Sequence, residues 1–148
     1  MAILSILLVA LFQLLTSIFD VQLESQATSS VSSDGRFILN RLGYDISRAG
    51  AITSPDVGSQ AASLVFSDGS ETYTYSLADG NLILSATPSG TQDQLNSYGT
   101  SVSDLSFLRL SDVGGEIDTI TVTFTLESIV IRRGGTESET FRITIGTR

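Results

Sequence analysis

The 148-residue sequence contains no cysteine, no histidine, no tryptophan and no lysine, so its eight basic residues are all arginines. Without cysteine, the chain has no disulfide, no thiolate ligand for zinc and no catalytic thiol. Without histidine, it lacks the residue that most often acts as a general base or binds a metal ion. The abundant serines and threonines therefore have no conventional base to activate them, which argues against an enzyme.

Basic residues are also few, because 16 acidic residues face 8 arginines and the formal net charge is −8 at pH 7. Phosphate binding requires arginine and lysine gathered on one face, so this balance argues against nucleic acid as a general partner. An acidic surface is typical of a soluble exterior domain. The length suits one domain with a real core and leaves no room for a second.

Charge is absent altogether from the first 19 positions, where only four residues are polar. Nineteen helical residues would span about 28 Å, close to the hydrocarbon thickness of a bilayer. A helix that is apolar on all sides lies either in lipid or inside protein. We therefore predict a transmembrane or filament-core helix within residues 1–30. Eight residues are predicted to form its surface: Ile3, Leu7, Leu8, Leu11, Phe12, Leu15, Ile18 and Phe19.

Two other interpretations of this segment compete with an anchor. A secretory signal peptide carries a basic region before its apolar run and a small-residue cleavage site after it. Here no arginine precedes the run, which also continues past the usual length of such a peptide. A buried core helix is the second alternative, but the rest of the chain is too short to surround it. The membrane-spanning or filament-core interpretation is therefore favoured.

A second helical pattern follows over residues 31–49. Its apolar residues recur at spacings of seven, four, four and three, which places them on one face of an α-helix. Gly50 is expected to cap the end of this helix, and Pro55 prevents any continuation. Gly35, which follows a serine-rich stretch, marks a point where the helix could kink or break. The face predicted to pack on a sheet consists of Val31, Ile38, Leu42, Ile46 and Ala49.

A continuous helix over residues 2–49 would be roughly 70 Å long, apolar all round in its first half and amphipathic in its second. Near its end, Arg41 and Asp45 lie four residues apart, and Asp45 and Arg48 lie three apart. Each pair is predicted to form a weak surface interaction.

After Pro55 the pattern changes to the two-residue alternation of β-strands. It is clearest over residues 120–126, where apolar residues alternate with threonine. Shorter alternating or apolar segments predict further strands at 64–66, 73–77, 82–84 and 141–145.

Turn signals separate these strands at residues 67–70 and 79–81. The alternation predicts one antiparallel sheet over residues 60–148, with one buried face and one wet face. The helical face described above is the expected partner of the buried side, so the predicted fold class is α+β. The polar segment 87–103 is predicted to be a surface loop.

Several acidic residues occur in predicted turns, among them Asp68, Asp79 and Asp112. The strings at residues 68–71 and 112–116 offer oxygen ligands of the kind that calcium prefers, but neither has the spacing of an EF-hand. We interpret these acids as turn formers, and we predict no metal and no cofactor.

Two other groups of residues invite a binding role. Tyr73 and Tyr75 alternate with polar residues and are predicted to face the core rather than bind a sugar. Arg132 and Arg133, beside two glycines, are interpreted as a solvated hairpin end, with a partner contact as the alternative.

The order of segments resembles that of type IV pilins and type II secretion pseudopilins, in which a long helix, apolar and then amphipathic, precedes an antiparallel sheet. Residues 1–12, MAILSILLVALF, look like the interior of the family's N-terminal helix. Residues 36–50, RFILNRLGYDISRAG, resemble the helix end of minor pilins and minor pseudopilins. The segments 102–107 and 120–126 are similar to the sheet of that subgroup.

The sequence departs from the family's pattern at its start. The family's processing motif is a glycine followed by Phe-Thr-Leu-x-Glu behind a short basic leader, and nothing like it precedes Ala2. Our interpretation is that Met1 corresponds to an internal methionine of the family helix and that the start codon is misplaced. The string Phe124-Thr-Leu-Glu127 lacks the preceding glycine and lies inside a predicted strand.

The resemblance implies a structural subunit of a type IV pilus, a type II secretion pseudopilus or a competence filament. It implies a single-pass protein of the cytoplasmic membrane, with residues 1–30 as its anchor and residues 31–148 as an exterior head that later joins a filament. Its partners would be the lipid bilayer before assembly and other pilin or pseudopilin subunits afterwards. The alternative function is a signal-anchored extracellular β-rich binding or adhesion module.

Overall fold

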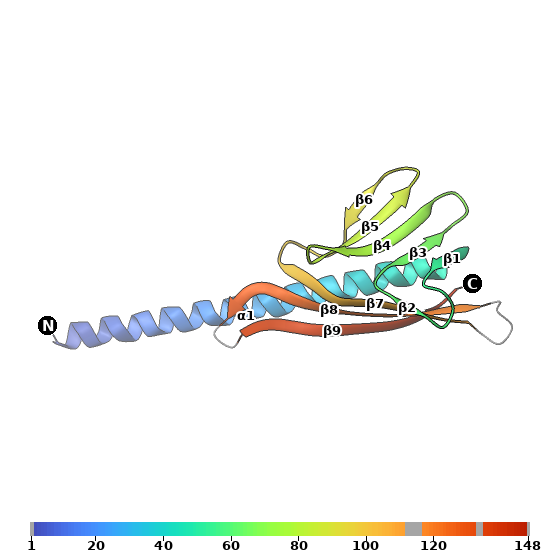
Figure 1. Cartoon of the computed structure of the whole chain (residues 1–148). Helices are drawn as coiled ribbons and strands as arrows, with labels where there is room; N and C mark the ends of the chain where they lie inside the picture. The colour runs from blue at the N-terminus through green and yellow to red at the C-terminus, as the bar shows by residue number, and fades with distance from the viewer. Residues whose placement is uncertain (1, 112–116, 133–134, 148) are drawn as a thin grey trace.

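The computed structural model describes residues 2–111, 117–132 and 135–147, which form one long helix and two antiparallel sheets. The predicted α+β fold is therefore confirmed (Figure 1). The elements are α1 (Ala2–Ser47), β1 (Ala51–Ser54), β2 (Gln60–Ala61), β3 (Leu64–Ser67), β4 (Thr72–Ala78), β5 (Asn81–Thr87), β6 (Gln92–Gln94), β7 (Thr100–Ser111), β8 (Asp118–Arg132) and β9 (Gly135–Gly146).

The helix α1 runs without interruption for 46 residues, or about 69 Å at 1.5 Å per residue. It continues through Gly35, where a kink or break was considered. Gly35 is buried, and a Cβ atom at this position would lie 2.1 Å from Cζ of Phe141 on β9. The glycine therefore permits close contact between helix and sheet instead of breaking the helix.

The end of α1 differs from the prediction. The helix ends at Ser47, and Gly50 is not its cap. In the final turn the Ala49 amide donates to the Ile46 carbonyl, whereas the Gly50 amide donates to the carbonyl of Ser67 on β3 at 2.8 Å. Gly50 thus begins the pairing of β1 with β3, a strand that the alternation after Pro55 did not predict.

The strands form two sheets, whereas one was predicted. The first has the order β1-β3-β4-β5-β6, and the second has the order β2-β7-β8-β9. The two-residue strand β2 pairs with β7 at the edge of the second sheet. It lies between β1 and β3 in the sequence, so one strand of the second sheet precedes most strands of the first. The second sheet is dominated by the long hairpins β7-β8 and β8-β9, which run beside α1 (Figure 1).

The hydrophobic core lies between α1 and the two sheets. The helix contributes a buried stripe, and the neighbouring face of β8 is apolar and fully buried. In the first sheet, the ring of Tyr75 on β4 packs against that of Phe107 on β7 with centroids 6.5 Å apart. The buried residues of β8 are Ile120, Val122, Phe124 and Leu126.

The segment 87–103, predicted to be a surface loop, is exposed over residues 87–94 but enters the fold after them. It contains β6 and the start of β7, and Leu95 and Val102 are buried. Asn96 is also buried, and its Oδ1 accepts a hydrogen bond from the Leu82 amide at 2.9 Å. The polar side chain therefore satisfies backbone groups inside the fold, where composition alone suggested solvent.

A carboxylate of the helix joins this segment to α1. Asp34 Oδ2 accepts from the Ser97 amide at 2.8 Å and from the Thr100 hydroxyl at 2.5 Å. On the far side of the head, Arg109 donates to the carbonyl of Ile52 at 2.8 Å and pairs with Asp118 at 2.7 Å. These two side chains fasten the helix and the first sheet to the second sheet.

Candidate assembly and membrane surface

The N-terminal half of α1 projects beyond both sheets (Figure 1). Of the residues whose exposure is described, Ala27 is the first that is buried. The eight residues predicted to form a membrane or filament-core surface have exposed fractions between 52% and 83%. The interpretation of this segment as a helix buried in the core is therefore wrong.

Residues 3–19 expose apolar side chains on every side of the helix. Leu7, Leu8 and Val9 are consecutive and all exposed, and consecutive residues point about 100° apart around a helix. The most apolar window of α1 has a mean hydropathy of 2.1, and none of it is buried. By length and composition the helix can cross a membrane, although a signal sequence meets the same test. Apolar surface on this scale marks contact with lipid or protein.

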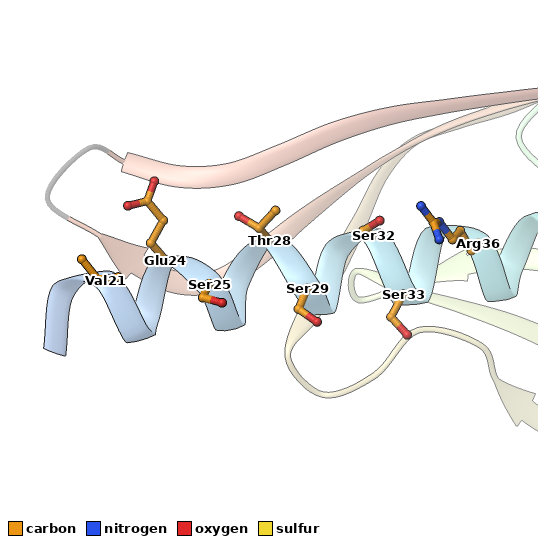
Figure 2. A pocket seen from close by; sticks show the side chains of 8 residues that line it. All are labelled: Val21, Glu24, Ser25, Thr28, Ser29, Ser32, Ser33 and Arg36. Carbon is orange, nitrogen blue, oxygen red and sulfur yellow. The ribbon is translucent and has the colours of Figure 1, made fainter. Parts of the chain in front are cut away.

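A hydroxyl-rich section of α1 follows the apolar half, on a side of the helix that the head leaves uncovered (Figure 2). An open hollow of about 750 Å³ runs along it. Serine and threonine side chains are short, so another helix can approach the backbone of α1 closely along this section. The residues that line the hollow are Val21, Glu24, Ser25, Thr28, Ser29, Ser32, Ser33 and Arg36.

The five residues predicted to pack on a sheet all lie in the core, with exposed fractions of 5% or less. The buried stripe also includes Ala27 and Gly35, which sequence reasoning missed. Both follow the same spacing of three and four residues, but they are small and do not stand out in an apolar pattern. On the opposite side of the helix, Phe37 and Tyr44 are exposed.

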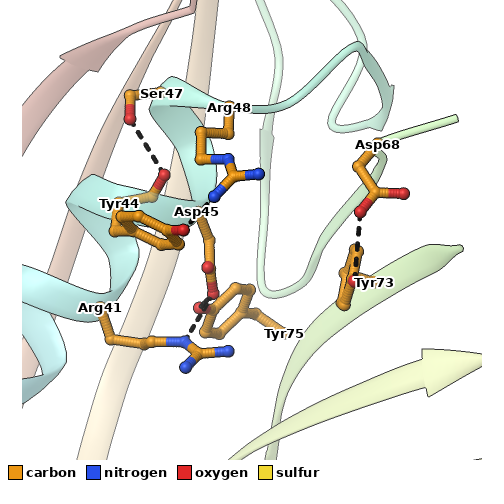
Figure 3. Close-up of polar contacts among 8 residues, drawn as sticks. All are labelled: Arg41, Tyr44, Asp45, Ser47, Arg48, Asp68, Tyr73 and Tyr75. Carbon is orange, nitrogen blue, oxygen red and sulfur yellow. Dashed lines mark hydrogen bonds and ion pairs between the residues drawn. The ribbon is translucent and has the colours of Figure 1, made fainter. Parts of the chain in front are cut away.

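A polar cluster joins the end of α1 to the first sheet (Figure 3). Asp45 Oδ2 accepts from Arg41 Nε at 2.8 Å and from the Tyr75 hydroxyl at 2.6 Å. The predicted pairing of Arg41 with Asp45 is therefore present, but Arg48 instead donates to the Tyr44 hydroxyl and lies over that ring. Burial and the neighbouring Asp45 carboxylate raise the pKa of Tyr75 well above its ordinary value of 10.0. Its phenol is thus held protonated, as a donor to Asp45.

Replacing Tyr75 by phenylalanine is expected to lower the free energy of unfolding by about 2 kcal/mol, because a hydrogen bond to a charged group is lost. Urea denaturation measures this change. The same substitution at Tyr73, whose exposed hydroxyl donates to Asp68 at 3.2 Å, is the control and is expected to change stability by less than about 0.5 kcal/mol. Equal effects at the two positions would contradict a structural role for the bond to Asp45.

Asp68 forms the turn between β3 and β4. Its Oδ1 accepts from the amides of Glu71 and Ser70 at 3.0 Å each, and from the Ser70 hydroxyl at 2.9 Å. The carboxylate is thus engaged within its own turn. Among the described residues, no group of three histidine, cysteine, aspartate or glutamate side chains could hold a metal ion. The other calcium candidate, 112–116, lies outside the described residues.

The hydrogen bonds from Glu71 and Ser70 lower the pKa of the Asp68 carboxyl from 3.8 to about 2. Because the folded pKa lies below the unfolded one, Asp68 stabilises the fold above pH 3.8 and loses this contribution as the pH falls through about 2. An NMR titration of the carboxyl carbon is expected to show the low pKa directly. Ser70→Ala is expected to raise it, and Ser76→Ala, a control on β4, is expected to leave it unchanged.

Comparison of the chain with family models, with curated proteins and with solved structures finds no match. The apolar helix packed on antiparallel sheets is consistent with a pilin-like layout. The feature that bears on function is therefore the apolar surface of α1 that the head leaves exposed.

Proposed function

We propose that this chain is a structural subunit, of the minor pilin or pseudopilin kind, that α1 anchors in a membrane and assembles into a filament. The observation that carries the proposal is the division of one continuous helix at Ala27. Before this residue the helix is exposed on every side, and after it one face is buried by the head. A helix apolar all round has two favourable surroundings, which are lipid and other helices.

Exchange between these two surroundings requires little free energy. Lipid chains are as apolar as leucine, so helices associate in and out of a bilayer through packing and not through a hydrophobic driving force. The core of the head begins at Ala27, so movement of the apolar half leaves that core intact. The unbroken helix links the two parts, and the subunit can therefore transfer from membrane to filament as a folded unit.

The proposed role is structural and not enzymatic. It places the acidic head on the side of the cytoplasmic membrane away from the cytoplasm and then on the filament surface, as the resemblance to pilins implies. Whether the filament serves adhesion, secretion or DNA uptake depends on its partner subunits.

Cysteine cross-linking tests the proposal, because the natural chain has no cysteine to compete. Single cysteines are introduced at successive positions of residues 3–19 in the full chain, which is then oxidised in native membranes and in sheared surface fractions. We expect disulfide-linked copies or partner adducts that recur every three to four positions, because one helix face meets a neighbour. A chain that is anchored but forms no cross-link at any position would contradict assembly and favour the anchored binding module.

A further inference from the structure

The hairpin β8-β9 reaches back along α1 toward the apolar half. The Ile129 amide donates to the Gly99 carbonyl at 3.1 Å, and a Cβ atom on Gly99 would lie 3.9 Å from the Ser30 hydroxyl. From this level β8 continues for three more residues toward the N-terminus of the helix. Figure 1 shows β8 and β9 ending beside α1, and Figure 2 shows that this part of the helix carries Val21 and Glu24.

The outward face of β8 changes character at this end. Along the head, every second residue from Thr119 to Thr125 is a threonine, of which Thr121 is buried, and the exposed Glu127 follows. Between Glu127 and Ile131 the pairing of β8 with β9 is irregular, and in this part Ile129 and Ile131 are both exposed, Ile131 by 80%. Apolar residues thus occupy the solvent side of the strand only at its end nearest the apolar helix.

The charge of this hairpin end also differs from that of the head. Residues 129–136, IVIRRGGT, contain two arginines and no acidic residue, between Glu127 and Glu137, in a chain whose net charge is −8. Basic segments next to a membrane are attracted to anionic lipid headgroups. Exposed isoleucines beside arginines match the interfacial layer of a bilayer, where apolar and charged groups are both accommodated.

The position of the hairpin along α1 also favours contact with the headgroup region. If residues 3–19 fill the hydrocarbon layer, Val21 and Glu24 lie at the level of the headgroups, which extend the bilayer from about 30 Å to about 40–45 Å. The ends of β8 and β9 lie beside these two residues (Figure 2). We propose that Ile129 and Ile131 form a second membrane contact, seated in the headgroup region of an anionic phospholipid bilayer. This inference rests on the proposed anchoring by α1 and adds that the head is held against the membrane at two points.

Single tryptophans test this contact, because the chain contains none. The probes are Ile131→Trp at the hairpin end, Phe12→Trp in the apolar helix and Ile117→Trp as a matched control. Ile117 is also an exposed isoleucine, and it precedes the opposite end of β8, about 45 Å away at 3.3 Å per residue. Each full-length variant is placed in vesicles of phosphatidylcholine and phosphatidylglycerol, with or without bromine on the acyl chains.

The expected result is blue-shifted emission and quenching by brominated lipid for Ile131→Trp and Phe12→Trp, and neither effect for Ile117→Trp. If only Phe12→Trp is quenched, the hairpin contact is refuted and the anchor stands. If neither Phe12→Trp nor Ile131→Trp is quenched, the anchor is refuted as well. Shielding of Ile131→Trp from aqueous iodide without quenching by lipid would identify a second protein chain as the occupant, and would also refute the lipid contact.

Discussion

Replacing Phe12 by aspartate is expected to shift the insertion of α1 into a bilayer by about 3 kcal/mol, which is roughly a hundredfold in the equilibrium. Phe12 lies within the apolar half and is 67% exposed, so the new carboxylate would meet lipid or a neighbouring helix instead of water. The measurement is the fraction of chain that stays in the membrane pellet after an alkaline wash. We expect this fraction to fall, and helix-to-helix cross-links to disappear.

Phe37 provides the matched control for this substitution. It is the same residue type on the same helix and is 54% exposed, but it lies beside the head, beyond the apolar half. Phe37→Asp is expected to leave membrane retention unchanged and to alter stability by less than about 0.5 kcal/mol. If both variants leave the membrane, or if neither does, the division of α1 into an anchor and a head-packing part is incorrect.

Replacing Gly35 by alanine is expected to lower the free energy of unfolding by about 3 kcal/mol, because the added methyl group overlaps the ring of Phe141. That ring cannot move aside easily. Phe141 pairs with Phe124 across β8 and β9, and their rings stack with centroids 5.4 Å apart. The steric penalty therefore exceeds the gain of up to about 1 kcal/mol that alanine brings to a helix interior.

Gly43→Ala is the control, because Gly43 lies in the same helix and a Cβ atom there would meet nothing within 4 Å apart from its own stretch of helix. Here only the gain in helix propensity remains, so the variant is expected to be more stable by up to about 1 kcal/mol. Thermal or urea unfolding of both variants gives the comparison. Stabilisation by both substitutions would show that Gly35 is merely tolerated in the helix and does not serve close packing.

Much of this fold could be predicted from local pattern. The absence of charge from the first 19 residues predicted the exposed apolar helix. The three- and four-residue spacing of apolar residues after it identified five members of the buried stripe. The Asp79-Gly80 turn has positive φ at both residues, as a two-residue hairpin requires, and it joins β4 to β5 where predicted. In each case the signal lies within a few residues of the chain and reflects one dominant physical preference.

The missed features depend on contacts between distant residues. Alternation shows which side of a strand is buried but not which strands pair, so it did not reveal two sheets. Asp34 bonds to Ser97 across 63 residues, and Arg109 bonds to Ile52 across 57, with no local signal for either. Gly35 shows the same limit, because a glycine that breaks a helix and a glycine that admits a ring have the same local sequence.

The hairpin end is a further case. In sequence, Ile129 and Ile131 are apolar residues at the positions where the alternation of β8 otherwise places threonine or glutamate, so the pattern assigns them no environment. In the structure both are exposed at the end of β8 that lies beside α1, and this position is what places them where lipid could contact them. The membrane contact thus depends on the fold and on the exposed helix together.

The proposed anchor and filament both require that the apolar half of α1 stays joined to the head in the mature protein. Mass spectrometry of the chain recovered from membranes and surface fractions of its own cells measures this. Peptides from residues 2–19 are expected in both fractions, in one polypeptide with the head. Recovery of the head as a soluble chain from which these residues have been removed would identify them as an export signal and would contradict the proposed anchor and filament.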